Sequence, residues 1–217
     1  MNRISQWHFF ISGATQNRQQ STGLQGLWLA SQAGAKKGVC FFPVLPWNYD
    51  WYTLARFVQI NSQKTKEGWE GGKIPFTLKI NIYAYSWGAG WGAVQLAQYL
   101  QSTAQYDVQN MVLADPVYCS TNPFLRWNSL FCSRFSLTRK FAPRIQIPSN
   151  TKNVYWSRQY NNWPRAHSLY SLPGSITDIH SPFLEKSLIH SKMDDSDWFQ
   201  KKVSHLVSLG GRLQLNA

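Results

Sequence analysis

The stretch from Phe76 to Leu100 limits most strongly how this chain can fold. Residues Thr77–Tyr85 are rich in β-branched and aromatic side chains and alternate in character, which is typical of a strand. Beyond Gly88, apolar side chains recur at helical spacing, at Trp91, Val94, Ala97 and Leu100. The segment therefore predicts a strand, a sharp turn with Ser86 at its apex, and a helix.

Strands and helices are predicted to alternate along the rest of the chain. Strands are expected at Trp7–Ile11, Val39–Val44, Val108–Ala114 and Asn153–Arg158, with a further short strand at Ile176–Ile179. Helices are expected at Gly23–Ala35, at Trp51–Ile60, and near the end of the chain with Asp194 or Asp195 as N-cap. Such alternation favours parallel strands joined by crossover helices. We predict an α/β fold in one domain over residues 1–217, with a mostly parallel central sheet flanked by helices.

Composition and charge restrict the partners and the environment. The chain has 22 Lys and Arg against 10 Asp and Glu, a net charge of +12, but the basic residues are scattered and form no nucleic-acid motif. Nucleic acid is therefore not favoured as a partner, whereas an anionic membrane or lipid surface is kept as one. Three cysteines without a C-x-x-C pair indicate neither a disulfide framework nor a zinc site. No signal-peptide core or membrane span is seen, so we expect a cytoplasmic protein.

The turn itself carries a chemical signal. Ala84 and Gly88 flank Ser86 at two residues on either side, and both are small enough for a strained turn in which these positions approach one another. The pentapeptide resembles the nucleophile elbow of α/β-hydrolases, with alanine in place of the usual first glycine. A serine in an ordinary Gly-rich junction between strand and helix is the alternative interpretation.

Two further residues extend the resemblance to a Ser-His-Asp triad. Asp115 follows the strand after the elbow helix, where lipase-type hydrolases carry the acid, although it could simply cap a loop or helix. His190 precedes the final helix, where α/β-hydrolases place the base, with His180 as the alternative base and Asp178 as a second acid. The order Ser86, Asp115, His190 is that of α/β-hydrolases. The resemblance covers most of the chain, from Trp7 to Leu209, and implies a small lipase- or esterase-like serine hydrolase.

The resemblance also implies a mechanism. Ser86 would attack an ester carbonyl, His190 would act as base and then acid, and Asp115 would orient the imidazole. Backbone N–H groups of Trp87 and of the loop at Gly13 and Ala14 would form the oxyanion hole. This chemistry requires no metal and no organic cofactor.

An insertion at about residues 119–150 is expected to face the substrate. It lacks long regular helix or strand signals and mixes apolar with basic side chains, which suits a lid or a membrane-contacting loop. A pair of short helices packed on the sheet is the alternative. The basic side chains proposed for anionic head groups are Arg126, Arg134, Arg139, Lys140 and Arg144. The side chains expected to line an apolar substrate pocket are Tyr85, Trp91, Phe124 and Trp127.

Two functions outside catalysis remain open from the sequence. A catalytically silent α/β-hydrolase scaffold used for binding would keep the small elbow residues without needing an aligned Ser-His pair. A basic peripheral protein of anionic membranes or nucleic acid would instead act through the insertion, with binding that depends steeply on salt. An ester hydrolase with an apolar acyl or aryl substrate is the favoured hypothesis.

Overall fold

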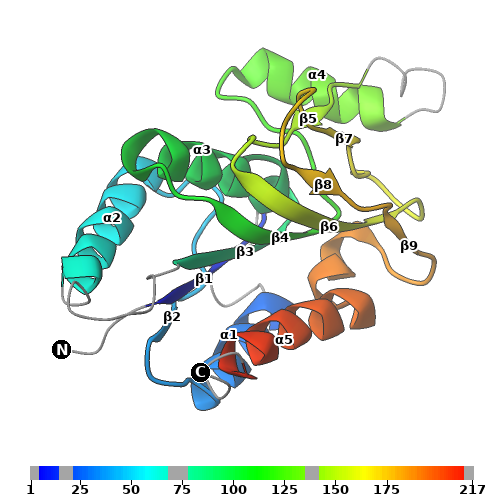
Figure 1. Ribbon diagram of the computed structural model, residues 1–217. Helices are drawn as coiled ribbons and strands as arrows, with labels where there is room; N and C mark the ends of the chain where they lie inside the picture. Colours follow the sequence, from blue (N-terminus) through cyan, green and yellow to red (C-terminus); the bar gives the residue numbers. More distant parts are fainter. Residues whose placement is uncertain (1–4, 15–21, 68–77, 135–141, 213–217) are drawn as a thin grey trace.

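The computed structural model of this chain describes residues 5–14, 22–67, 78–134 and 142–212. Its centre is a twisted sheet in the strand order β2-β1-β3-β4-β6-β8, and β9 also pairs with β6 (Figure 1). All pairings in the described part of the chain are parallel. The strands are β1 (Gln6–Ile11), β2 (Val39–Phe41), β3 (Lys79–Tyr85), β4 (Val108–Ala114), β6 (Thr151–Gln159), β8 (Asp178–Ile179) and β9 (Phe183–Glu185).

Helices cover both faces of this sheet. In Figure 1, α1 (Thr22–Ala33) and α5 (Asp197–Arg212) lie together on one face, and α2 (Trp51–Glu67) and α3 (Ala93–Ala104) lie on the other. Helix α4 (Pro123–Arg134) lies near the small parallel pair β5 (Ile145–Gln146) and β7 (Leu169–Tyr170). The fold is therefore α/β, with a parallel central sheet flanked by helices.

Two apolar cores follow from the alternation of side chains along the strands. In β1, Trp7, Phe9 and Ile11 belong to the core shared with α2 and α3, whereas Phe10 belongs to the core shared with α1 and α5. All six residues of β1 and the last six of β3 are buried, as expected for central strands of a parallel sheet covered on both faces. The buried sheet provides a rigid base for the loops at its carboxyl edge.

Most of the predicted elements are present, and several bounds are corrected. The strand predicted at Val39–Val44 ends at Phe41, and Thr77, the start of another predicted strand, lies outside the described residues. Within the insertion expected at about residues 119–150, residues 123–134 form α4 and residues 145–146 form β5, although the sequence carries no long regular signal there. The predicted N-cap was also wrong: α5 begins at Asp197, and Ser196 Oγ accepts the backbone N–H of Phe199 at 3.1 Å.

Candidate active site

Ser86 lies at the apex of a strained turn between β3 and a helix. Its φ angle is 56°, in the left-handed region that non-glycine residues seldom adopt. Backbone hydrogen bonds hold the turn on both sides of Ser86. The Ser86 N–H donates to Ala114 O at 3.0 Å, and the Ser86 carbonyl accepts the N–H groups of Ala89, Gly90 and Val117 at 2.9–3.1 Å. The sequence-predicted elbow is therefore present as a strand, a left-handed serine and a helix.

The helix after Ser86 begins with a π-helical turn, η1 (Gly88–Gly92), that packs unusually close to neighbouring backbone. A Cβ atom on Gly88 would lie 2.4 Å from the carbonyl oxygen of Ser12, at the end of β1. A Cβ atom on Gly90 would lie 1.9 Å from the carbonyl oxygen of Val117, in the loop after β4. Only glycine permits these approaches, so the glycines bring the elbow against the ends of both neighbouring strands.

Ser86, His190 and Asp115 form a continuous hydrogen-bonded chain. Ser86 Oγ lies 2.8 Å from His190 Nε2, and His190 Nδ1 lies 2.6 Å from Asp115 Oδ2. The three residues are 5%, 7% and 0% exposed, respectively. The structure thus brings together the serine, the histidine and the carboxylate that the sequence singled out, from the ends of β3 and β4 and from η3 (His190–Asp195).

The partners of the imidazole assign its tautomer. An ionised Asp115 can only accept, so His190 Nδ1 carries the proton that is donated to it. Nε2 then has a free lone pair and accepts the Ser86 Oγ–H. The Oγ to Nε2 distance of 2.8 Å is within the range in which a base can take a proton from a nucleophile.

The carboxylate of Asp115 is held by more than the histidine. Its Oδ1 accepts the backbone N–H groups of Gln159 and Ala166, both at 3.2 Å, and its Oδ2 also accepts Gln159 Nε2 at 3.1 Å. Asp115 itself has a φ of 44°, which turns the chain away as β4 ends. Gln159, at the end of β6, was not predicted as part of the site because an amide without a carboxylate gives no catalytic signal in the sequence.

The backbone of His190 is fixed on both sides by side chains. Its N–H donates to Asn162 Oδ1 at 2.7 Å, and its carbonyl accepts the Tyr85 hydroxyl at 2.8 Å. Burial, followed by the charge of Asp194, raises the pKa of Tyr85 well above its ordinary value, so the phenol remains a donor at neutral pH. Tyr85, predicted to line a substrate pocket, is buried, and its hydroxyl instead holds the backbone of His190 in place.

The loop that carries His190 contains a second buried carboxyl group. Asp194 is 1% exposed, and burial together with the nearby Asp195 raises its pKa to about 6. A Cβ atom on Gly23 would lie 2.3 Å from the Asp194 carbonyl oxygen, so helix α1 packs directly on this loop. The position of His190 therefore depends on close contact between α1 and η3.

The predicted pocket residues do not share one cavity. Trp91 lines a cavity of about 260 Å³ together with Trp51, Arg126 and the loop at residues 47–49. Phe124 and Trp127 are exposed on α4, by 76% and 56%, and are not among the residues that line this cavity. Of the basic side chains named for anionic head groups, Arg139 and Lys140 lie outside the described residues, as does the side chain of Arg134.

The alternative base and acid lie away from Ser86. His180 stacks on Tyr155, with ring centroids 4.3 Å apart, and its Nε2 lies 3.5 Å from Asp178 Oδ2. His180 Nε2 therefore pairs with the alternative acid, and its backbone N–H donates to Val154 O at 3.0 Å. His190 is the histidine that contacts the serine.

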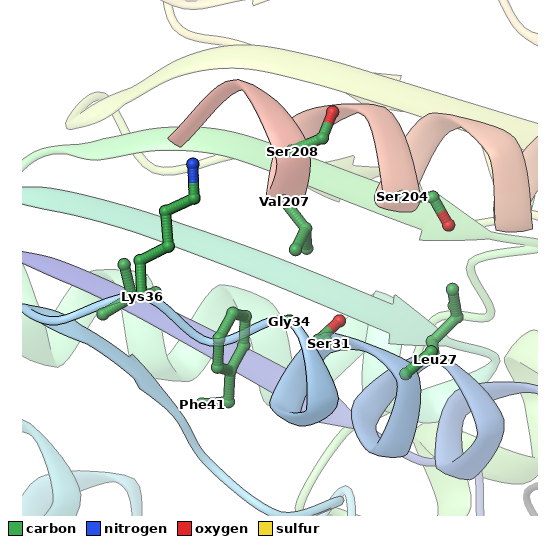
Figure 2. A pocket seen from close by; sticks show the side chains of 10 residues that line it. Leu27, Ser31, Gly34, Lys36, Phe41, Ser204, Val207 and Ser208 are labelled. Atoms are coloured by element: carbon green, nitrogen blue, oxygen red, sulfur yellow. The ribbon is translucent and has the colours of Figure 1, made fainter. Parts of the chain in front are cut away.

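A larger cavity lies elsewhere, between α1, α5 and β2. Figure 2 shows this space of about 470 Å³, with Leu27, Ser31, Phe41 and Val207 among the side chains that line it. The hydrogen-bonded residues Ser86, His190 and Asp115 do not line this cavity. His8, which stacks on Phe41, is fully buried, and burial lowers its pKa to about 3, so it stays neutral in the core.

Comparisons with known proteins leave the chain without an assigned family. No protein-family model matches it, and no curated protein is significantly similar in sequence.

Within the described residues, no group of three or more His, Cys, Asp and Glu side chains could hold a metal ion. In the same part of the chain, none of the helices combines the length and the apolar character needed to cross a membrane.

Proposed function

We propose that this protein is a serine hydrolase that cleaves carboxylic esters through a Ser86-His190-Asp115 triad. The observation that supports this most strongly is the hydrogen-bonded chain of 2.8 and 2.6 Å that begins at a serine in the left-handed conformation. A strained, buried serine hydrogen-bonded to a histidine whose other nitrogen contacts a carboxylate is the arrangement that activates a nucleophile. The resemblance to α/β-hydrolases seen in the sequence agrees with this proposal.

The first half of the reaction forms an acyl-enzyme. Ser86 Oγ attacks the ester carbonyl while His190 Nε2 takes its proton, and the positive charge on the imidazolium is stabilised by Asp115. The proton then passes from Nε2 to the departing alkoxide, which leaves as the alcohol. In the second half, His190 takes a proton from water, the resulting hydroxide adds to the acyl carbon, and Ser86 leaves with the proton returned to Oγ.

The proposed oxyanion hole consists of backbone N–H groups next to Ser86. Trp87 begins a helix, where N–H groups have no intrahelical acceptor, and so its N–H is available to a ligand. Gly13 lies against the elbow, because a Cβ atom placed there would be 3.0 Å from Ser86 Cβ. We assign the second donor to Gly13 or Ala14. Removing one such donor typically costs about 3 kcal/mol of transition-state stabilisation.

The exposed aromatic side chains of α4 support a substrate with an apolar acyl or aryl group. Helix α4 is the longest element that the structure describes in the proposed lid, and it exposes Phe124, Leu125, Trp127 and Phe131. It is also tied to the body of the protein, since Trp163 Nε1 donates to Leu130 O at 2.8 Å. We propose that this exposed apolar surface contacts substrate or an anionic lipid surface.

Covalent labelling with a fluorophosphonate probe tests the proposal. Such probes phosphonylate activated serines, and we expect an adduct at Ser86 by mass spectrometry that is absent in Ser86→Ala and His190→Ala. His180→Ala is the matched control, because His180 pairs with Asp178 rather than with Ser86, and it should retain the wild-type labelling rate. Absence of labelling in the folded wild type between about pH 6 and 9 would refute an activated serine and favour a binding role.

A further inference from the structure

Arg126 lines the cavity of about 260 Å³ beside the elbow and is held by two indole rings. Its guanidinium carbon lies 5.5 Å from the ring centroid of Trp47 and 5.5 Å from that of Trp87. These two indoles pack edge-on, with centroids 5.0 Å apart. Trp87 directly follows Ser86 in the chain, so Arg126 contacts the side chain of the residue next to the proposed nucleophile.

The position of Arg126 is fixed, but most of its donors are not used within the described part of the protein. Nε donates to Ser120 O at 2.9 Å. A guanidinium has four further N–H groups, and the hydrogen bonds and ion pairs formed among the described residues give those of Arg126 no acceptor. Asp50, the carboxylate that follows the cavity-lining loop, instead accepts the N–H of Thr53 at 3.0 Å and caps α2.

Such an environment favours an oxyanion as ligand. Cation–π contact with two indole rings restricts the guanidinium and leaves the edge formed by its two terminal nitrogens available for two parallel hydrogen bonds. Carboxylate and phosphate oxygens match that edge in geometry and charge. The cavity is smaller than the 300–1,000 Å³ typical of whole small-molecule sites, so it suits one part of a substrate.

We propose that Arg126 binds an anionic group on the substrate, so that the ester cleaved at Ser86 carries a carboxylate or a phosphate as a second functional group. The inference rests on the proposed hydrolase function and deepens it by naming a substrate class. Arg126 is a specificity-determining residue in this proposal, and the Trp47 and Trp87 rings position it. The anionic part of the substrate occupies this cavity, and the ester group lies outside it, at Ser86.

Matched pairs of esters test the proposal. On the acyl side, mono-4-nitrophenyl glutarate is compared with 4-nitrophenyl valerate, in which a methyl group replaces the carboxylate. On the alcohol side, phenyl acetate is compared with 4-carboxyphenyl acetate and 4-acetoxyphenyl phosphate, which separates a carboxylate ligand from a phosphate ligand. The measured quantity is the ratio of kcat/KM for the anionic ester to that for its neutral partner. Intrinsic reactivity cancels when the ratio in a variant is divided by that in the wild type.

Arg126→Gln is expected to lower this ratio by about tenfold or more for at least one pair, since hydrogen bonds to charged groups are worth more than neutral ones. Arg126→Lys, which keeps the charge but loses the paired donors, should recover part of it. Lys202→Gln is the matched control, because it also removes one positive charge from above an aromatic ring, 4.1 Å from the centroid of Tyr155, but Lys202 does not line this cavity. It should leave the ratio unchanged.

The outcomes separate this inference from the hydrolase proposal. If fluorophosphonate labels Ser86 but Arg126→Gln changes every ratio by less than twofold, the anion site is refuted and the hydrolase proposal stands. If the wild type is neither labelled nor active on any of these esters, the hydrolase proposal fails, and titration of tryptophan fluorescence with glutarate and with inorganic phosphate decides the anion site. Quenching that disappears in Arg126→Gln and persists in Lys202→Gln would support it, and equal titrations in all three proteins would overturn it.

Discussion

The left-handed conformation of Ser86 predicts that glycine at this position gives a more stable protein than alanine does. Ser86→Ala and Ser86→Gly both remove Oγ and with it the 2.8 Å contact to His190. The two variants differ only in a Cβ atom at a residue with a φ of 56°. Comparing them therefore isolates the cost of placing an L side chain in this turn.

The magnitude follows from two opposing effects. A Cβ atom in the left-handed region costs roughly 1–2 kcal/mol. Glycine has more conformational freedom in the unfolded chain, which lowers the stability of the glycine variant by about 0.5–1 kcal/mol and offsets part of this gain. The conformation itself is imposed from outside the side chain, because Ala89, Gly90 and Val117 donate to the Ser86 carbonyl and will still do so in both variants. We expect Ser86→Gly to be the more stable variant by about 1 kcal/mol.

Urea unfolding of the two variants, followed by tryptophan fluorescence, measures this difference, and a rise in Tm of about 2–4 °C is the thermal equivalent. Gln105 provides a control because its φ is 54° at the end of α3, on an exposed side chain. Gln105→Gly should also exceed Gln105→Ala in stability. If the glycine variant is favoured at Gln105 but not at Ser86, the elbow is not strained, and the structural argument for an activated serine loses its basis.

Three further changes have expected outcomes. Burial raises the pKa of Asp194 to about 6 from an ordinary value of 3.8, so its ionisation destabilises the fold as pH rises through that range. In urea unfolding, Asp194→Asn should raise the free energy of unfolding by about 1–3 kcal/mol at pH 7 and leave it unchanged below about pH 4. An equal increase at both pH values would contradict this. Gly90→Ala places a Cβ 1.9 Å from Val117 O and should lower the free energy of unfolding by about 2 kcal/mol or more, whereas Gly26→Ala, with open space around its Cβ, should not lower it. Gln159→Glu sets a second carboxylate against Asp115, so labelling at Ser86 should slow by about tenfold or more; a rate within twofold of wild type would argue against the role of Asp115.

The parts of the fold that could be predicted from the sequence are those that repeat a pattern over many residues. The long central strands and the helices on either face show clear periodicity, and the elbow combines a strand, two small residues and a helix in one continuous segment. Strands of two or three residues, such as β5, β7 and β9, are too short to carry a period. They are formed because a neighbouring strand offers free backbone groups, which the local sequence does not show.

Helix α4 was missed for a different reason. Its apolar residues Phe124, Leu125, Trp127 and Phe131 are all exposed and do not form a single buried stripe, so the helical period is masked. A start signal was nevertheless present, because Asn122 is followed by proline and its Oδ1 accepts the N–H of Phe124 at 2.9 Å. The same oversight applies to Ser196 before α5. At α5 the N-cap preference alone did not suffice, because Asp194 and Asp195 satisfy it as well as Ser196 does.

Backbone strain concentrates at the carboxyl edge of the sheet. Among the described residues, three that are not glycine have a positive φ, namely Ser86, Gln105 and Asp115. Gln105 ends a helix, where this conformation is common. The other two each follow a strand, and those strands are neighbours paired in register, with Tyr85 opposite Ala114. Each left-handed residue turns its side chain off the end of its strand toward the same space, which His190 occupies from η3. Neither conformation is needed to bury apolar surface, so the distribution of strain points to a site rather than to the core.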